Sequence, residues 1–131
     1  MNPFFLKIAI IISALSVALG AFAAHALKNI IPAASIITFE TGVRYQFYHA
    51  FALLIASSVL YKNCNQRFVV IACRFFSFGL IFFCGSLYLL AMLGPDYKFI
   101  GAITPIGGMC FIIGWIMLFA SVNHKNLTNK N

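Results

Sequence analysis

The sequence predicts an all-α polytopic membrane protein, a bundle of four transmembrane helices joined by short loops. The 131 residues are 63% hydrophobic and only 8% charged, whereas a soluble domain carries roughly 25% charged residues. Four continuous apolar segments, at about residues 4–27, 39–61, 68–93 and 100–122, each have the length of about 20 residues that a helix needs to cross a bilayer. We therefore expect one four-helix transmembrane domain over residues 1–131, with the lipid bilayer as its surroundings.

The first segment has an alternative interpretation. Lys7, the apolar stretch after it and the run Ala21-Phe22-Ala23 together resemble a cleavable signal peptide. The apolar stretch is longer than the roughly 7–15 residues of a signal core, however, and it continues through the would-be cleavage site. We expect a retained helix, whereas cleavage would leave three helices and place the new N-terminus outside.

The other three helices are bounded by polar or helix-breaking residues. The connection at 28–38 contains Pro32, the connection at 62–67 reads KNCNQR, and the connection at 94–99 opens with Gly-Pro. In the fourth segment, Thr104 precedes a proline, which is typical of an N-cap residue and a first helical position. The tail from residue 123 is polar, and we expect it to be frayed.

The placement of basic residues predicts the orientation, because cytoplasmic loops carry the excess of lysine and arginine. If the N-terminus lies inside, the outer loops hold only Lys28 and Lys98. The cytoplasmic set is then Lys7, Lys62, Arg67, Lys125 and Lys130. We expect both termini in the cytoplasm, and we expect the Arg74 side chain to extend toward the same face.

Charge and cysteine placement exclude several classes of function. The net charge is +7, but the basic residues stand singly at the edges of apolar segments, which is not the pattern of a nucleic-acid binder. Four cysteines, Cys64, Cys73, Cys84 and Cys110, form no C-x-x-C pair and no metal-ligand spacing with histidine. We expect no metal and no cofactor, and we expect the cysteines in the apolar segments to act as small hydrophobic residues.

Small residues recur along each predicted helix at spacings that place them on one face. Helices in lipid associate through close packing of such residues, since lipid tails remove most of the hydrophobic drive between helices. The residues expected to pack helix against helix are Ser16, Gly20, Ala24, Ala52, Ala56, Gly79, Gly107 and Gly114.

Polar residues gather where all four helices reach the outer half of the bilayer. Such residues are costly in a membrane, and they usually face the bundle or a cavity. The cluster comprises His25, Lys28, Glu40, Arg44, Tyr45, Gln46, His49, Ser86, Tyr88 and Thr104. The spacing of Glu40 and Arg44 predicts an ion pair on one helix face, and His49 lies nearly opposite Glu40, so it needs partners from other helices.

Three functions and one structural interpretation are compatible with this cluster. We expect a non-enzymatic protein whose cluster binds a partner helix, a lipid headgroup or a small anion, because the single aspartate and single glutamate offer no carboxylate pair for catalysis. The alternative is a small transporter or proton-conducting subunit with His49 as the titrating group, which would need to form a homo-oligomer. A weaker alternative is a redox protein with haem held by His25 and His49. In the structural interpretation, the same residues serve as helix caps and interfacial anchors.

Four stretches resemble a known family: GAFAAHALK at 20–28, FETGVRYQFYHAFALL at 39–54, FCGSLYLLAMLG at 83–94 and IGAITPIGGMCFIIGW at 100–115. Together they are similar to the uncharacterised family called domain of unknown function 423, which includes YgdD- and YwdK-like proteins and transmembrane protein 256. The resemblance implies a four-helix integral protein of the bacterial plasma membrane. It implies no activity, so it assigns no functional residue.

Overall fold

The computed structural model describes residues 1–123, and every regular element in this part of the chain is helical. The expected frayed tail lies outside the described residues, apart from its first residue, which ends the last helix. The elements are α1 (Pro3–His25), η1 (Leu27–Asn29), α2 (Ala33–Ile55), η2 (Ala56–Leu60), α3 (Tyr61–Asn63), α4 (Gln66–Gly79), η3 (Leu80–Cys84), α5 (Gly85–Leu93), η4 (Pro95–Ala102) and α6 (Thr104–Asn123).

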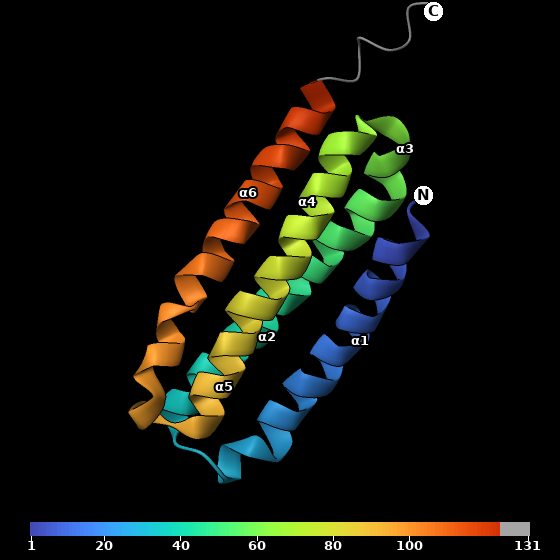
Figure 1. Cartoon of the computed structure of the whole chain (residues 1–131). Coiled ribbons are helices and arrows are strands. Elements are labelled where there is room, and N and C mark those ends of the chain that lie inside the picture. Colours follow the sequence, from blue (N-terminus) through green and yellow to red (C-terminus); the bar gives the residue numbers. More distant parts are fainter. Residues whose placement is uncertain (124–131) are drawn as a thin grey trace, which may run out of the picture.

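These elements form four antiparallel rods (Figure 1). The rods are α1, then α2 continued by η2 and α3, then α4 continued by η3 and α5, and finally α6. The closest packing pairs α1 with α2 and α4 with α6, and α5 joins the two pairs through α2. The bundle therefore consists of two tightly packed helix pairs. Because the pairs touch each other less closely, there is room for grooves between α1 and α4 and between α2 and α6.

The helix bounds agree with the predicted segments to within a few residues, except in the second. That helix begins at Ala33 and not at Phe39, because Pro32 stands directly before it, where a missing N–H costs nothing. The fourth helix begins at Thr104, as its Thr-Pro pattern predicts. Before it, residues Pro95–Ala102 form a 3₁₀ helix.

Three described segments are long and apolar enough to cross a membrane: Pro3–Asn29, Gln66–Leu93 and Asp96–Val122. The second rod is not among them, because the polar residues around Gln46 and His49 lower its hydropathy. Those two side chains are buried inside the bundle, and the rod lies alongside the others over their common length (Figure 1).

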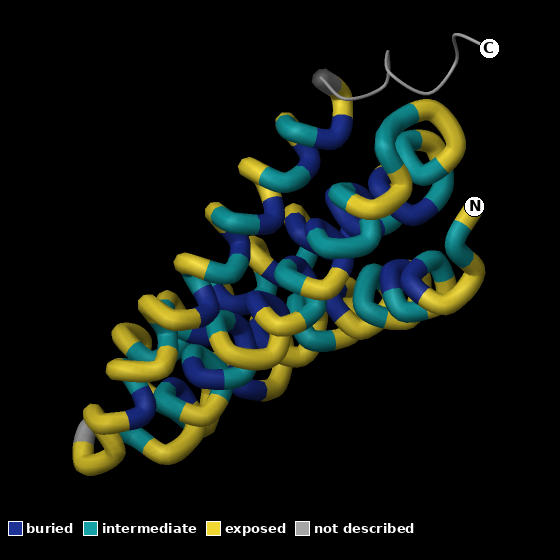
Figure 2. The backbone as a smooth tube through the Cα atoms, turned by 45° about the horizontal axis from the view of Figure 1, so that its top comes forward, coloured by how far each residue is buried: buried dark blue, intermediate teal, exposed yellow. Residues whose placement is uncertain are grey.

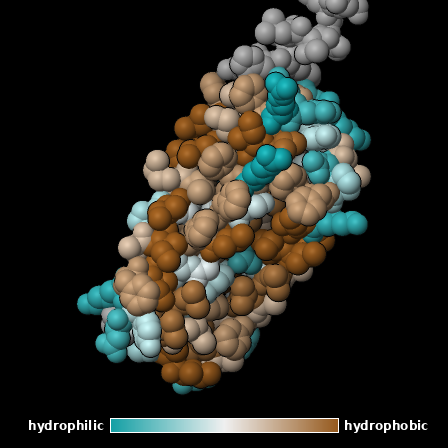
Figure 3. All heavy atoms as spheres, in the orientation of Figure 1, coloured by the Kyte–Doolittle hydropathy of each residue, from teal (hydrophilic) through white to brown (hydrophobic). Residues whose placement is uncertain are grey.

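The surface has the polarity of a membrane protein. Buried residues line the inside of the bundle (Figure 2), while large apolar side chains such as Ile11, Ile81 and Phe119 are exposed around it. In the space-filling view, hydrophobic residues cover the middle of the visible face and hydrophilic residues gather toward its ends (Figure 3). An apolar belt of this kind fits a hydrocarbon core between two polar interfaces.

Glycine and aromatic residues interlock across the helix contacts. A Cβ atom added at Gly114 would lie 2.6 Å from Cε1 of Phe76, and one at Gly42 would lie 2.7 Å from Cε1 of Tyr88. At Gly79, the added atom would collide with the ring of Phe111. Gly79 and Gly114, two of the residues expected to pack helix against helix, thus lie where only glycine leaves room for these rings.

The other predicted packing residues agree with the structure except for one. Ser16, Ala52, Ala56 and Gly107 are buried, and Gly20 is half-buried against Val43 of α2. Ala24 is exposed, so its prediction was wrong. Four residues turn an α-helix by 400°, so a line drawn through every fourth residue rotates by 40° around the helix at each step. The buried face of α1 therefore passes to Ala23 and Leu27.

Two π-helical turns interrupt the long rods, at Ala56–Leu60 and at Leu80–Cys84. Such a turn holds one extra residue and changes the backbone hydrogen-bond pattern. In the first turn, the carbonyl of Ser57 accepts a 2.8 Å hydrogen bond from the backbone N–H of Asn2. This bond ties the beginning of α1 to the end of the second rod.

Candidate functional site

The predicted polar cluster separates into a buried network around Gln46, a pair between α5 and α6, a pocket around His49, and an exposed group. Gln46 forms the centre of the buried network, because its amide bonds to two neighbouring helices. Its Nε2 donates to Ser16 Oγ at 3.0 Å and to the Ile12 carbonyl at 3.3 Å, both on α1. Its Oε1 accepts from the Tyr88 hydroxyl of α5 at 2.8 Å. The network connects three helices, and both the nitrogen and the oxygen of the Gln46 amide are hydrogen-bonded.

Ser86 and Thr104 form a separate polar contact near the start of α6. Their hydroxyl oxygens lie 2.7 Å apart, and Ser86 Oγ also donates to the Phe83 carbonyl at 2.9 Å. Since the Ser86 hydroxyl has one proton, Thr104 donates to Ser86. The structure therefore joins two of the predicted cluster residues, and their contact fastens α5 to α6.

His49 is held in one protonation state by its two ring contacts. Nδ1 lies 2.8 Å from the backbone carbonyl of Tyr45, which can only accept, so this nitrogen carries a proton. Nε2 accepts a 3.3 Å hydrogen bond from the indole Nε1 of Trp115, which can only donate. The ring is therefore a neutral imidazole with the proton on Nδ1. The bond to Trp115 is the longer of the two.

The His49 ring lies among aromatic side chains. It stacks on Phe111, with ring centroids 3.5 Å apart and an interplanar angle of 11°. Together with Tyr45, Phe83 and Trp115, it lines a pocket of about 400 Å³ between α2 and α6. The pocket is partly open, because Tyr45 and Trp115 are exposed by 40% and 49%.

Trp115 was missed as a site residue by the sequence analysis. It is the only tryptophan in the chain, and an indole N–H inside a membrane requires an acceptor. His49 in turn needed a hydrogen-bond partner from another helix. These two requirements together were the signal that could have linked Trp115 to His49.

The remaining members of the predicted cluster lie on the surface. His25, Lys28, Glu40 and Arg44 are all exposed. The predicted ion pair between Glu40 and Arg44 is not formed in the described part of the chain. Arg44 Nη2 instead donates to the hydroxyl of Thr41 at 3.1 Å, which is one residue closer along the helix.

The two histidines proposed as haem ligands lie far apart. Ser16 is level with Gln46 and Gly20 with Val43, so the antiparallel register places His49 beside residue 13 of α1. His25 is twelve residues beyond that level, about 18 Å at 1.5 Å per residue. The two rings cannot ligate one iron. In residues 1–123, no three histidine, cysteine or acidic side chains gather into a possible metal site.

Comparison with known proteins places the chain in a family. The sequence model described as protein of unknown function (DUF423) matches residues 19–108. UPF0382 membrane protein SSP2132 of Staphylococcus saprophyticus is 42% identical, over 86% of this chain and 94% of its own length. UPF0382 membrane protein YwdK of Bacillus subtilis is 39% identical, with the same coverage of both chains.

A more distant relative covers more of the chain. UPF0382 inner membrane protein YgdD of Escherichia coli is 33% identical, over 95% of this chain and 93% of its own length. No solved structure matches the chain. The predicted resemblance is confirmed: the chain belongs to the DUF423 family, the UPF0382 membrane proteins of unknown molecular function.

Proposed function

We propose that this chain is a non-enzymatic membrane protein that binds a lipid-soluble ring compound with a hydroxyl group in the His49 pocket. One observation carries the proposal. His49, a polar ring in the apolar part of the bundle, lines a partly open aromatic pocket and is held there by a long bond to Trp115. Ligand pockets are typically apolar cavities with a few well-placed polar groups.

The two polar atoms of the pocket define the chemistry of the ligand. His49 Nε2 is an acceptor and Trp115 Nε1 is a donor. A hydroxyl group can donate to the first and accept from the second, so it can insert between them without leaving either atom unpaired. A planar ring behind the hydroxyl can pack on the aromatic walls in an offset or edge-on geometry.

The test uses the fluorescence of Trp115, which reports on the pocket because the chain has no other tryptophan. The protein in lipid nanodiscs is titrated with 4-butylphenol and with 4-butylanisole, at equal concentrations in the membrane. The anisole has the same ring and chain but its methyl ether cannot donate. We expect a saturable change in emission with the phenol and a weak, non-saturating change with the anisole.

Two variants complete the design. His49→Phe keeps an aromatic ring and removes the acceptor, so we expect it to abolish the difference between the two probes. His25→Phe makes the same exchange at an exposed histidine and is expected to bind like the wild type. Equal responses to phenol and anisole in the wild-type protein would refute the proposed hydroxyl recognition.

We also propose that both termini face the cytoplasm of a bacterial inner membrane. The relatives are membrane proteins of bacteria, and YgdD is named an inner membrane protein. The excess of lysine and arginine at the end of the bundle with the N-terminus supports this orientation. Fusions of alkaline phosphatase and of green fluorescent protein to the C-terminus test it, because the first is active only outside. An active phosphatase fusion would reverse the assignment.

A further inference from the structure

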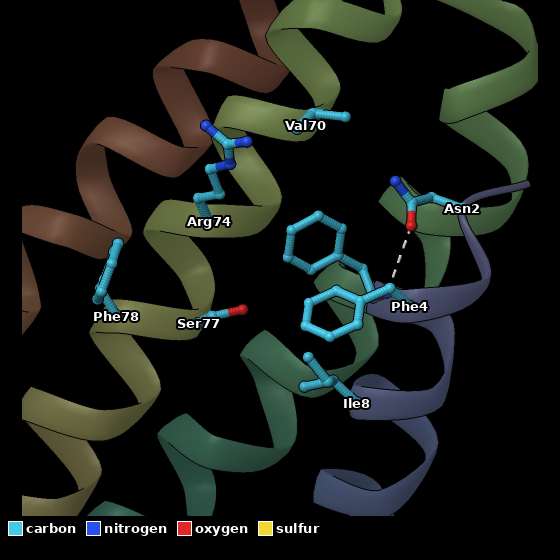
Figure 4. A pocket seen from close by; sticks show the side chains of 8 residues that line it. Asn2, Phe4, Ile8, Val70, Arg74, Ser77 and Phe78 are labelled. Carbon is cyan, nitrogen blue, oxygen red and sulfur yellow. Dashed lines mark hydrogen bonds between the residues drawn. The ribbon is translucent and has the colours of Figure 1, made fainter.

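A second pocket lies between other helices, near the beginning of α1. It is a cleft of about 680 Å³ between the first turns of α1 and the middle of α4. Figure 4 shows Phe4 and Ile8 on one side and Val70, Arg74, Ser77 and Phe78 on the other. Phe4 and Phe78 are 65% and 53% exposed, so the cleft is open to the lipid.

Arg74 gives this apolar cleft a positive charge that no acidic side chain neutralises. The chain has only two acidic residues, Glu40 and Asp96. Both lie toward the opposite end of the bundle, in the first half of α2 and in η4. Arg74 forms no ion pair or hydrogen bond with another described side chain. An arginine along a membrane helix is costly unless its charge is balanced, so an anion from outside the chain would stabilise the exposed Arg74 side chain.

The geometry of α4 brings a second arginine toward the same place. Arg67 and Arg74 are seven residues apart, two helical turns, and both line a recess next to the cleft with Val70 and Ile71. Arg74 lies about 12 Å along α4 from Gln66, at 1.5 Å per residue. Its guanidinium points toward the level of Val70 (Figure 4), which is the direction of the membrane interface.

A third donor completes the rim of the cleft. The Asn2 side-chain oxygen accepts from the Phe5 backbone N–H at 3.5 Å, while the amide nitrogen faces the cleft (Figure 4). Guanidinium groups bind phosphate oxygens through paired hydrogen bonds. An amide nitrogen can donate to an ester carbonyl. The polar rim, formed by the arginines and Asn2, thus matches a lipid headgroup, and the apolar lining matches an acyl chain.

We propose that this cleft binds an anionic glycerophospholipid from the leaflet at the N-terminal end of the bundle. The phosphate lies against Arg74 and Arg67, and the Asn2 amide donates to a chain ester. One acyl chain lies along Phe4 and Phe78. Basic pockets between transmembrane helices are where anionic lipids bind other membrane proteins.

The experiment is native mass spectrometry of delipidated protein, mixed with equal amounts of phosphatidylglycerol and phosphatidylcholine of identical chains. We expect one phosphatidylglycerol to remain bound, and Arg74→Gln to weaken its binding at least about fivefold, the effect of one basic residue near a membrane surface. Lys98→Gln removes the same charge at the opposite end of the bundle and is expected to bind like the wild type. Equal retention of phosphatidylcholine, or equal loss with Lys98→Gln, would overturn the proposal.

Two further measurements test the parts of the site separately. Ser77→Phe fills the cleft without changing its charge, and we expect it to lose the lipid as well. Glycerol 3-phosphate, which has no acyl chain, is expected to compete only weakly, and effective competition would show that the apolar cleft contributes nothing. Arg74→Gln removes one charge from the exposed surface and leaves the apolar segments unchanged, so we expect it to insert, and unchanged Trp115 emission verifies the fold.

Discussion

Replacing Gly107 by alanine tests whether α6 packs as closely as the structure shows. A Cβ atom at Gly107 would collide with the backbone nitrogen of Phe83 and lie 2.6 Å from its Cβ and 2.7 Å from its Cα. Ordinary contacts between carbon atoms are about 3.5–4.0 Å long, so α6 must move outward by about 1 Å. The obstacle is backbone, which cannot rotate away. Such overpacking costs about 1–3 kcal/mol.

The neighbouring glycine provides a matched control. At Gly108, the added Cβ would lie 3.8 Å from the nearest atoms, in the ring of Phe83, which is ordinary contact. Both substitutions gain the same helix propensity, about 1 kcal/mol for alanine over glycine. The difference in stability between the two variants therefore isolates the packing term, and we expect Gly107→Ala to be less stable than Gly108→Ala by about 1–3 kcal/mol. Reversible unfolding by sodium dodecyl sulfate in mixed micelles, followed by circular dichroism, measures it. Equal midpoints would refute the close approach of α6 to η3.

Three further predictions concern the polar residues. Gln46→Leu removes three hydrogen bonds, worth about 0.6 kcal/mol each in a membrane, so we expect a loss of about 2 kcal/mol in the same assay; Tyr88→Phe should cost less in this background than in the wild type, and strict additivity would contradict the shared bond. Liposomes containing the protein should stay tight to protons, because both ring nitrogens of His49 are engaged; a pH-dependent flux that His49→Phe abolishes would instead establish proton conduction. If the exposed arginine of α2 binds anionic headgroups, Arg44→Ala should reduce cosedimentation with anionic vesicles while leaving membrane insertion intact, and unchanged binding would reject that role.

The number of helices and most of their bounds could be predicted because lipid demands long continuous apolar segments. The start of the second helix was missed because the connection at 28–38 contains Pro32, which was read as a break in the helix. A proline prevents a helix from continuing through it from the N-terminal side, but a new helix can begin directly after it, as α2 does after Pro32. The two π turns could not be predicted, since no residue type marks them and they arise from how neighbouring helices fit together.

The candidate site was predictable only in part. The burial of Gln46 and His49 follows from their cost in lipid and from their common face on one helix. Their partners depend on which residues of other helices lie at the same level, and that register is a property of the packed bundle. The sequence therefore placed Tyr88 and Gln46 in one cluster without pairing them, and it left Trp115 out.

The π turn at Leu80–Cys84 has a consequence for how this family tolerates insertions and deletions. Losing one residue from a regular transmembrane helix rotates everything beyond it by about 100° and turns the buried face toward lipid. A π turn already contains one residue more than an α-helical turn needs. Deleting one residue within it is therefore expected to straighten the local hydrogen bonding and keep Ser86 and Tyr88 directed inward. Relatives one residue shorter at this place can retain the same bundle, whereas a deletion elsewhere in the rod cannot be absorbed.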